Sequence, residues 1–187
     1  MHKDIESIIL SEKQLEKIVN SIAKKIETDY NGKEFIMIGL LKGSVAFMVD
    51  LMKKIDLDFA IDFMVASSYG YGTESTGKVK IKSEGTIPVE GKHVLVVEDI
   101  VDSGNTLSFV CNYLVTKGAK SVRVAALCDK PSRRKVPFTP DYVGTEIPDE
   151  FIVGYGFDYE DKYRNLPYIG VLKRSVFEKS ALRGKAN

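Results

Sequence analysis

The spacing of hydrophobic residues changes along this chain: some segments are near-continuous apolar runs, and in others the apolar residues recur every three or four positions. Apolar runs within 34–41, 93–99 and 121–129 predict strands. The run at 93–99 does not alternate with polar residues, which is typical of a strand buried on both faces of a parallel sheet.

Segments around these strands have the spacing of amphipathic helices. Residues 11–26 begin with Ser11 and Gln14 at the spacing of a capping box, and their apolar residues share one helical face. Residues 43–55 and 107–118 predict further helices. Strand and helix alternate through the middle of the chain, so the sequence predicts an α/β fold with an open parallel sheet flanked by helices.

Residues 57–67 and 79–85 predict further strands, and shorter strand candidates lie at 141–147, 151–159 and 168–173. We expect the late short strands, together with residues 58–81, to add a smaller lobe. No repeat or linker interrupts the sequence, which predicts a single domain over residues 1–187.

The segment from Gly72 to Val79, GTESTGKV, nearly matches the phosphate-binding pattern G-x-x-x-x-G-K-[ST]. Val79 stands where a hydroxyl should meet Mg²⁺, and no apolar helix follows, so a nucleoside triphosphatase is excluded. Residues 67–78 instead predict a long loop between strands, either an inert hairpin or an active-site lid.

The strongest chemical signal is VLVVEDIVDSGNTL, Val94 to Leu107. An apolar strand runs into Glu98 and Asp99, Asp102 follows, and a turn of small polar residues precedes the next helix. In an open parallel sheet, ligands bind at the carboxyl ends of the strands. The segment therefore predicts a binding site.

The turn from Asp102 to Thr106 has the residue types expected of a phosphate-binding site. The first turn of a helix offers free N–H groups to an anion, Gly104 permits close approach, and Ser103 and Thr106 add hydroxyl groups. Glu98 and Asp99 suit sugar hydroxyls, Mg²⁺ or proton transfer. The combination favours a ribose phosphate over the alternative, a simple helix cap beside solvent-exposed acids.

Composition removes several function classes. The net charge of +1 does not indicate a nucleic-acid surface, and no apolar run could span a membrane. The first residues have no signal-peptide pattern, so we expect a cytoplasmic protein. Cys111 and Cys128 lie in apolar patterns and predict buried reduced thiols, while only two histidines make histidine acid–base chemistry improbable.

These motifs together resemble the type I phosphoribosyltransferases, and most closely the bacterial hypoxanthine-guanine phosphoribosyltransferases. VVEDIVDSGNT resembles the family's phosphoribosyl-pyrophosphate (PRPP) signature, although Asn105 stands where members vary. The other matching motifs are GLLKGS, SSYG followed by STGKVKI, LCDKPSRR, and IPDEFIVGYGFDYEDKYRNLPYIGVL. The resemblance covers about residues 40–172.

The resemblance implies a purine salvage reaction. Ribose 5-phosphate would pass from PRPP to hypoxanthine or guanine, giving IMP or GMP and pyrophosphate, with Mg²⁺ as cofactor. The enzyme would be a homodimer or homotetramer with no nucleic-acid or membrane partner. A hood would form mainly from the N-terminal segment and about residues 146–187, and residues 68–78 would be a flexible lid.

Site roles carried over from the family fall into groups. Asp102 would be the general base near purine N7. The ribose and phosphate groups would be held by Glu98, Asp99, Asp102, Ser103, Gly104, Asn105 and Thr106. Pyrophosphate would be held by Leu41, Lys42, Gly43 and Arg164, and the Leu41–Lys42 bond can be cis. The purine would be bound by Lys130, Phe151, Ile152 and Asp158, the metal by Glu98, Asp99 and Asp158, and the lid would carry Ser68 and Tyr69.

Plainer interpretations of these residues stay open. Lys130 alone could be a solvated lysine, Phe151 a core residue, and Asp158 with Arg164 a surface ion pair. Two other functions also remain: a non-catalytic regulator of the same fold that senses PRPP or nucleotide, and a transferase that prefers xanthine or a 6-aminopurine.

Overall fold

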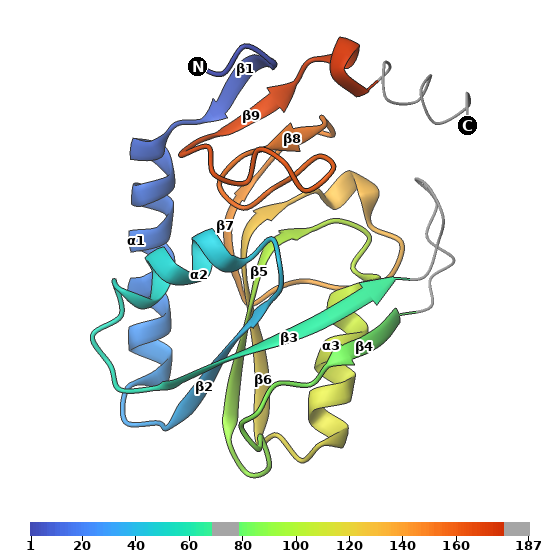
Figure 1. Cartoon of the computed structure of the whole chain (residues 1–187). Coiled ribbons are helices and arrows are strands. Elements are labelled where there is room, and N and C mark those ends of the chain that lie inside the picture. Colours follow the sequence, from blue (N-terminus) through green and yellow to red (C-terminus); the bar gives the residue numbers. More distant parts are fainter. Residues whose placement is uncertain (69–78, 178–187) are drawn as a thin grey trace. The chain divides into compact units, whose positions relative to one another are not determined.

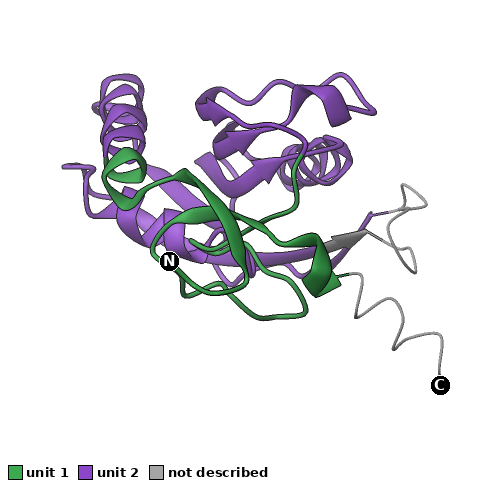
Figure 2. Cartoon of the chain, turned by 90° about the horizontal axis from the view of Figure 1, so that it is seen from above, with its two compact units in different colours: residues 1–16, 150–187 green, residues 17–149 purple. Residues whose placement is uncertain are grey.

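The computed structural model describes residues 1–68 and 79–177. The chain divides into two compact units, one of residues 1–16 with 150–187 and one of residues 17–149 (Figure 2). The larger unit contains the central sheet and the strand-to-helix turn predicted to bind phosphate. None of the helices within the described ranges is long and apolar enough to cross a membrane.

A mostly parallel sheet is the centre of the larger unit (Figure 1). Its strand order is β4 (Val79–Ser83), β3 (Ala60–Ser68), β2 (Phe35–Leu40), β5 (His93–Val101), β6 (Ser121–Asp129) and β7 (Tyr142–Glu146). All neighbours are parallel except β4, which pairs antiparallel with β3. The central strands are buried on both faces, which explains the unbroken apolar runs of β2 and β5.

Helices cover both faces of this sheet. α3 (Asn105–Thr116) packs on the face that carries Ile38 and Val96. Side chains alternate along a strand, so Gly39 faces the other way, where a Cβ atom would collide with Met48 of α2 (Val45–Met52). α1 (Glu12–Tyr30) lies on that second face. The predicted α/β fold with an open parallel sheet flanked by helices is confirmed.

A small antiparallel sheet forms the centre of the other unit. Its order is β1 (Ile5–Leu10), β9 (Ile169–Leu172) and β8 (Ile152–Val153). Ile5, Val153 and Leu172 bury their side chains in a small separate core. The unit thus joins the two ends of the chain through strand pairing.

Two expectations about the strands were wrong. The described parts of residues 58–81 add no second lobe, because β3 pairs in parallel with β2 and β4 completes the edge of the main sheet. The candidate at 141–147 also joins the main sheet, as β7. β1 was not predicted, because its apolar residues do not alternate regularly with polar ones. Tyr69 and the rest of the predicted lid after Ser68 lie outside the described residues.

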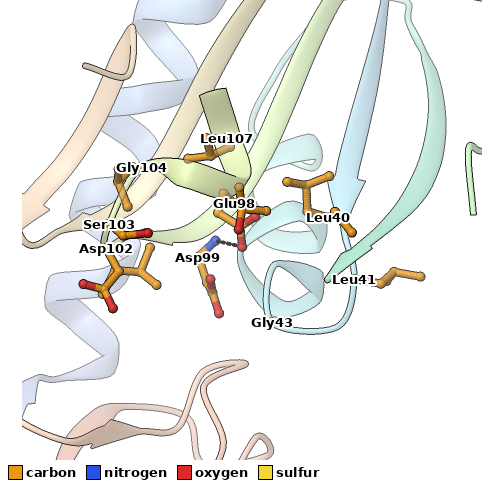
Figure 3. Close-up of a pocket in the computed structure, with 13 residues that line it drawn as sticks. Leu40, Leu41, Gly43, Glu98, Asp99, Asp102, Ser103, Gly104 and Leu107 are labelled. Carbon is orange, nitrogen blue, oxygen red and sulfur yellow. Dashed lines mark hydrogen bonds between the residues drawn. The ribbon is translucent and has the colours of Figure 1, made fainter. Parts of the chain in front are cut away.

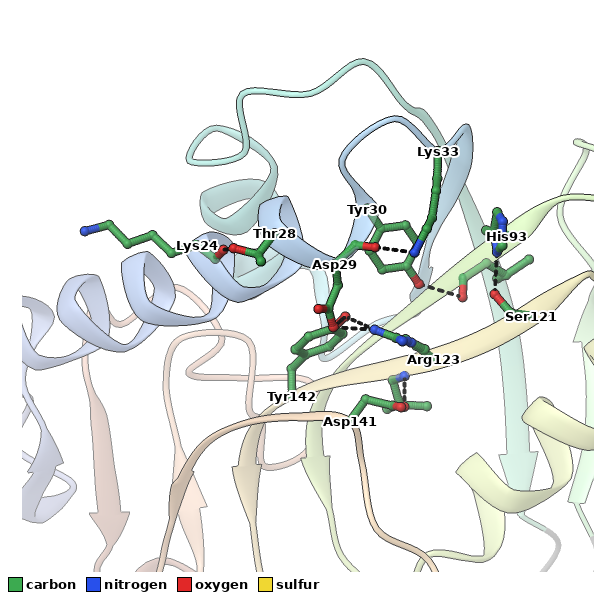
Figure 4. A network of polar contacts seen from close by, with 12 residues as sticks. Lys24, Thr28, Asp29, Tyr30, Lys33, His93, Ser121, Arg123, Asp141 and Tyr142 are labelled. Carbon is green, nitrogen blue, oxygen red and sulfur yellow. Dashed lines mark hydrogen bonds and ion pairs between the residues drawn. The ribbon is translucent and has the colours of Figure 1, made fainter.

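A polar network ties the end of α1 to the sheet (Figure 4). The Tyr142 hydroxyl donates a hydrogen bond of 2.8 Å to Asp29 Oδ2 and accepts one of 2.8 Å from Arg123. Arg123 also forms an ion pair with Asp29. The hydrogen bond from Tyr142, followed by that from Arg123, holds the pKa of Asp29 below its usual value.

Replacing Tyr142 by phenylalanine should destabilise the protein at neutral pH by about 1 kcal/mol or less, because the bond is part-exposed and screened by solvent. A lowered carboxylate pKa stabilises the fold above the ordinary aspartate pKa and ceases to do so in acid. Denaturant unfolding of both proteins at pH 7 and near pH 3 measures this. A deficit that stays the same in acid would contradict a role for ionised Asp29.

Candidate active site

The end of β5 extends past its neighbour β2. β2 pairs with β5 only as far as Gly39 with Val97, whereas β6 pairs with it up to Val101 with Asp129. Glu98 and Asp99 therefore lie within β5 rather than after it, on the stretch that β2 leaves uncovered. The loop that follows β2 takes that place.

A pocket of about 250 Å³ opens at this point (Figure 3). It brings together the predicted first pyrophosphate loop, the acid pair and the turn into α3. Its lining residues are Leu40, Leu41, Gly43, Ala66, Glu98, Asp99, Ile100, Val101, Asp102, Ser103, Gly104, Thr106 and Leu107. The structure thus places most of the predicted ribose, phosphate and pyrophosphate residues of the larger unit in one hollow.

Two adjacent carboxylates shape the electrostatics of this pocket. Asp99 is only 9% exposed, and its backbone N–H donates to Glu98 Oε1 at 3.2 Å. Burial, and then the negative charge of Asp99, raise the pKa of Glu98 well above its usual value. A bound cation or donor would favour the doubly ionised pair.

The loop after β2 lies directly against these acids. The peptide bond between Leu41 and Lys42 is cis, as the resemblance predicted, and Lys42 is exposed. A Cβ atom on Gly43 would stand 1.9 Å from Asp99 Oδ2. Only glycine fits here while the carboxylate keeps its place, which gives Gly43 a steric role in addition to its predicted contact with pyrophosphate.

The turn from β5 to α3 has the geometry of an anion site. Gly104 adopts φ +81°, in the left-handed region, and α3 begins at Asn105. The N–H of Asn105 donates to Ser103 Oγ at 3.3 Å. The first turn of α3, with the N–H groups of Thr106 and Leu107, borders the pocket and favours a negative charge there.

A neighbouring loop braces this turn from outside. Arg134 donates to the backbone carbonyl of Asp102 and to Asp129 Oδ1. The carbonyl of Ser103 accepts the N–H of Lys135 at 2.9 Å. Sequence reasoning missed the roles of Arg134 and Asp129, although both lie in the LCDKPSRR segment, because their link to the turn arises from tertiary packing.

Lys130 ends up beside the strand that carries the acids. It follows β6, is 8% exposed, and donates its backbone N–H to the carbonyl of Val101 at 2.9 Å. Its Nζ lies 3.7 Å from Asp149 Oδ1. The plain interpretation of a solvated surface lysine is therefore wrong.

The remaining predicted residues belong to the other unit. Phe151 is 45% exposed and stacks on Phe177 with a centroid distance of 5.5 Å. Ile152 is the first residue of β8. Asp158 Oδ1 and Arg164 form an ion pair of 2.7 Å, and Arg164 also donates to the Gly156 carbonyl. These contacts leave the predicted ligand roles of Phe151, Ile152, Asp158 and Arg164 as predictions.

The acid pair is the part of the described chain that suits a divalent cation. Among all the residues that the structure describes, no cluster of three or more His, Cys, Asp or Glu side chains could enclose a metal ion. Mg²⁺ commonly binds one or two carboxylates and takes its other ligands from water and substrate phosphates. Glu98 and Asp99 fit that mode. Burial raises the pKa of Cys111 to about 11 and also raises the pKa of Cys128, so neither free thiol ionises readily near neutral pH.

Known proteins share both the sequence and this architecture. The family model for the phosphoribosyl transferase domain matches residues 6–160. The chain is 48% identical over 179 residues to a hypoxanthine-guanine phosphoribosyltransferase of Staphylococcus epidermidis, with 96% of this chain and 100% of that protein covered. A crystal structure of a hypoxanthine phosphoribosyltransferase from Staphylococcus aureus has a TM-score of 0.91 at 46% identity, covering 95% of this chain and 96% of that chain.

A longer relative contains the same region. The chain is 46% identical over 177 residues to the bifunctional protein TilS/HprT of Listeria monocytogenes. The match covers 95% of this chain but spans only 27% of the length of that protein.

The raised pKa of Glu98 makes a testable prediction about stability. A carboxyl group whose pKa is raised by folding lowers stability as the pH rises through that pKa, because the ionised form is disfavoured in the folded protein. Glu98→Gln should therefore melt at least about 2 °C above the unmodified protein at pH 8 and less so at pH 5, without Mg²⁺. Scanning calorimetry at both pH values checks this.

Glu34→Gln, at an exposed position before β2, supplies the control. If Glu98→Gln raised the melting temperature equally at both pH values, or if the control raised it as much, the charge of Glu98 would not be the cause of the increase.

Proposed function

Because this chain belongs to the phosphoribosyl transferase domain family, we propose that it transfers the 5-phosphoribosyl group of PRPP to N9 of hypoxanthine or guanine. The products would be IMP or GMP and pyrophosphate. The observation that carries the proposal is the single pocket that joins the acid pair, the Gly43 loop and the first turn of α3. Relatives of matching length that are named hypoxanthine-guanine phosphoribosyltransferase support the choice of purine.

PRPP would be held through its opposite chemical ends. The 5-phosphate would bind Asp102 to Thr106, where backbone N–H groups and the helix dipole attract an anion. The ribose hydroxyls would bind Glu98 and Asp99. Mg²⁺ held at these two carboxylates, together with substrate oxygens, would supply positive charge for the pyrophosphate.

The acid pair also suits the electronic demand of the reaction. Displacement of pyrophosphate from the ribose develops positive charge on the sugar and negative charge on the leaving group. Glu98 and Asp99 would stabilise the sugar cation, while Lys42 and the backbone at Leu41 and Gly43 would face the leaving pyrophosphate. Arg164 would also contact pyrophosphate, a role that rests on the resemblance alone.

The purine would be selected by hydrogen bonding. Lys130 carries an ammonium group, which only donates, and O6 of hypoxanthine or guanine only accepts. Asp102 would accept a proton near N7 as the general base. For Phe151 (stacking), Ile152 (backbone carbonyl) and Asp158 (purine and second metal), the proposal rests on the family motif.

Further parts of the proposal rest on the sequence rather than on the described structure. A lid at residues 68–78, with Ser68 and Tyr69, would shield the reactive sugar from water. The enzyme would work in the cytoplasm as a homodimer or homotetramer, and the free cysteines are compatible with a reducing compartment.

Pyrophosphate release tests the proposed reaction directly. The purified protein is incubated with PRPP and Mg²⁺ and with each of hypoxanthine, guanine, xanthine and adenine. We expect turnover with hypoxanthine and with guanine, and we expect nucleotide formation to stop when Mg²⁺ is chelated. Release with xanthine alone, or with no purine, would show that the assignment is wrong.

Asp102→Asn should keep PRPP binding and lower kcat by about 10²–10⁴-fold, the usual contribution of general acid–base catalysis. The amide preserves the size of the side chain but cannot accept the proton. Steady-state kinetics with hypoxanthine, together with a PRPP binding isotherm, separate the two effects. Near-normal turnover would remove Asp102 from the role of general base.

Lys130 should determine the preference for 6-oxopurines. Adenine presents an amino group to the ammonium, and a desolvated site built on a hydrogen bond can reject such a mismatch by about 10⁴-fold. We expect Lys130→Ala to lose most activity and this preference together. The ratio of kcat/KM for hypoxanthine to that for adenine measures it, and efficient adenine turnover by the unmodified protein would contradict the assignment.

A further inference from the structure

An arginine outside the predicted site contacts the predicted general base. Arg133 Nε lies 2.8 Å from Asp102 Oδ1, and the same guanidinium reaches Asp149 Oδ1 through its NH1 group at 3.2 Å. Asp149 Oδ1 in turn lies 3.7 Å from Lys130 Nζ. A continuous series of opposite charges therefore links Asp102, the proposed base, to Lys130, the proposed O6 donor.

The local backbone accounts for this reach. Pro131 follows Lys130 and opens a 3-10 turn, η1 (Pro131–Arg133). The turn is closed by a hydrogen bond of 3.0 Å from the Arg133 N–H to the Lys130 carbonyl. One turn after Lys130, the chain thus places Arg133 next to Asp102.

The contact distinguishes the two oxygens of the carboxylate. The Asp102 side chain is 46% exposed, yet its Oδ1 has almost no accessible surface and accepts no aligned hydrogen bond from the described residues, so its contact with Arg133 Nε is an ion pair. Arg133 lies against that atom, so Oδ2 is the accessible oxygen. In Figure 3 the Asp102 carboxylate points away from Glu98, which keeps it apart from the acid pair.

We propose that Arg133 is a positioning residue, which fixes the Asp102 carboxylate so that Oδ2 accepts the purine proton, with Asp149 as its anchor. The inference rests on the proposed function and adds a residue to it. A planar guanidinium suits the task because Nε and NH1 bind two acids at once, whereas an ammonium is a single point charge. The fork thereby couples the orientation of the base to the loop that carries Lys130.

The exposure of these groups indicates a catalytic rather than a stabilising contribution. Arg133 and Asp149 have side chains that are 46% and 51% exposed. Ion pairs this open to solvent contribute little to folding. Their removal should therefore leave the protein folded, so a loss of turnover can be assigned to the site by comparison with a control that removes a similarly exposed charge.

A double-mutant cycle tests the proposal. Turnover of hypoxanthine at saturating PRPP and Mg²⁺ is measured for the unmodified protein, Arg133→Gln, Asp102→Asn and the double variant. Arg133→Gln should lower kcat by about 10-fold, as a slightly misplaced catalytic group does, with KM for PRPP changed by less than about 2-fold. In the Asp102→Asn background, Arg133→Gln should lower kcat by less than about 2-fold, because the carboxylate that Arg133 positions is gone.

Matched variants separate positioning from general effects. Asp149→Asn removes the anchor and should lower kcat in the same direction by about 3-fold, which keeps the test decisive if Arg133→Gln does not fold. Lys117→Gln removes a cation from a similarly exposed pair with Glu84, at the opposite end of α3, and should leave kcat unchanged. Thermal midpoints are recorded for every variant.

The outcomes are distinct. An unmodified protein that forms no nucleotide from any 6-oxopurine would overturn both the proposed function and this inference. If the protein is active but Arg133→Gln lowers kcat by the same factor with and without the Asp102 carboxylate, the inference alone would be overturned. An equal loss from Lys117→Gln would do the same, since it would trace the effect to lost charge in general.

Discussion

Two carboxylates on consecutive residues of a buried strand are the constraint on which the site depends. Neighbouring positions of a strand point to opposite faces, yet burial and mutual repulsion still act on the pair and raise the pKa of Glu98. The surroundings adapt to them. β2 stops pairing before they begin, and Gly43 leaves out a side chain where Asp99 needs the space. A bound cation or a set of hydroxyl groups would complete the arrangement chemically.

The elements nearest in sequence to this pair were also the ones that could be predicted. The strand, the acids, the turn and α3 follow one another without a break, so local patterns suffice to specify them. The α/β class followed from the same alternation. By contrast, the apolar residues of β1 do not alternate regularly with polar ones, and this segment forms a strand by pairing with β9, more than 150 residues away.

Contacts between distant segments explain the other differences. Residues 58–81 contain ordinary strand patterns, and nothing in them specifies whether they pair with β2 or form a lobe of their own. The partners of Arg133 and Arg134 could not be predicted either, because Asp102 and Asp149 are distant from them in sequence and the contact with Asp129 depends on the fold of η1. A motif reports which residues are near in sequence, whereas a charge network depends on the folded loop.

The larger unit separates opposite charges along one short stretch of chain. In the proposed reaction the acids of β5 would stabilise a sugar that gains positive charge, and the N-terminus of α3, which follows within a single turn, would stabilise a phosphate. The left-handed conformation of Gly104 allows the chain to pass from the acidic end of β5 to the positive end of the α3 dipole within one tight turn. The 131–136 loop holds this turn in place by hydrogen bonds to the carbonyls of Asp102 and Ser103. Because these bonds go to backbone atoms, the side chain of Asp102 remains available for chemistry. Its orientation then needs a contact of its own, and the Arg133 guanidinium is the described group that supplies one at Oδ1.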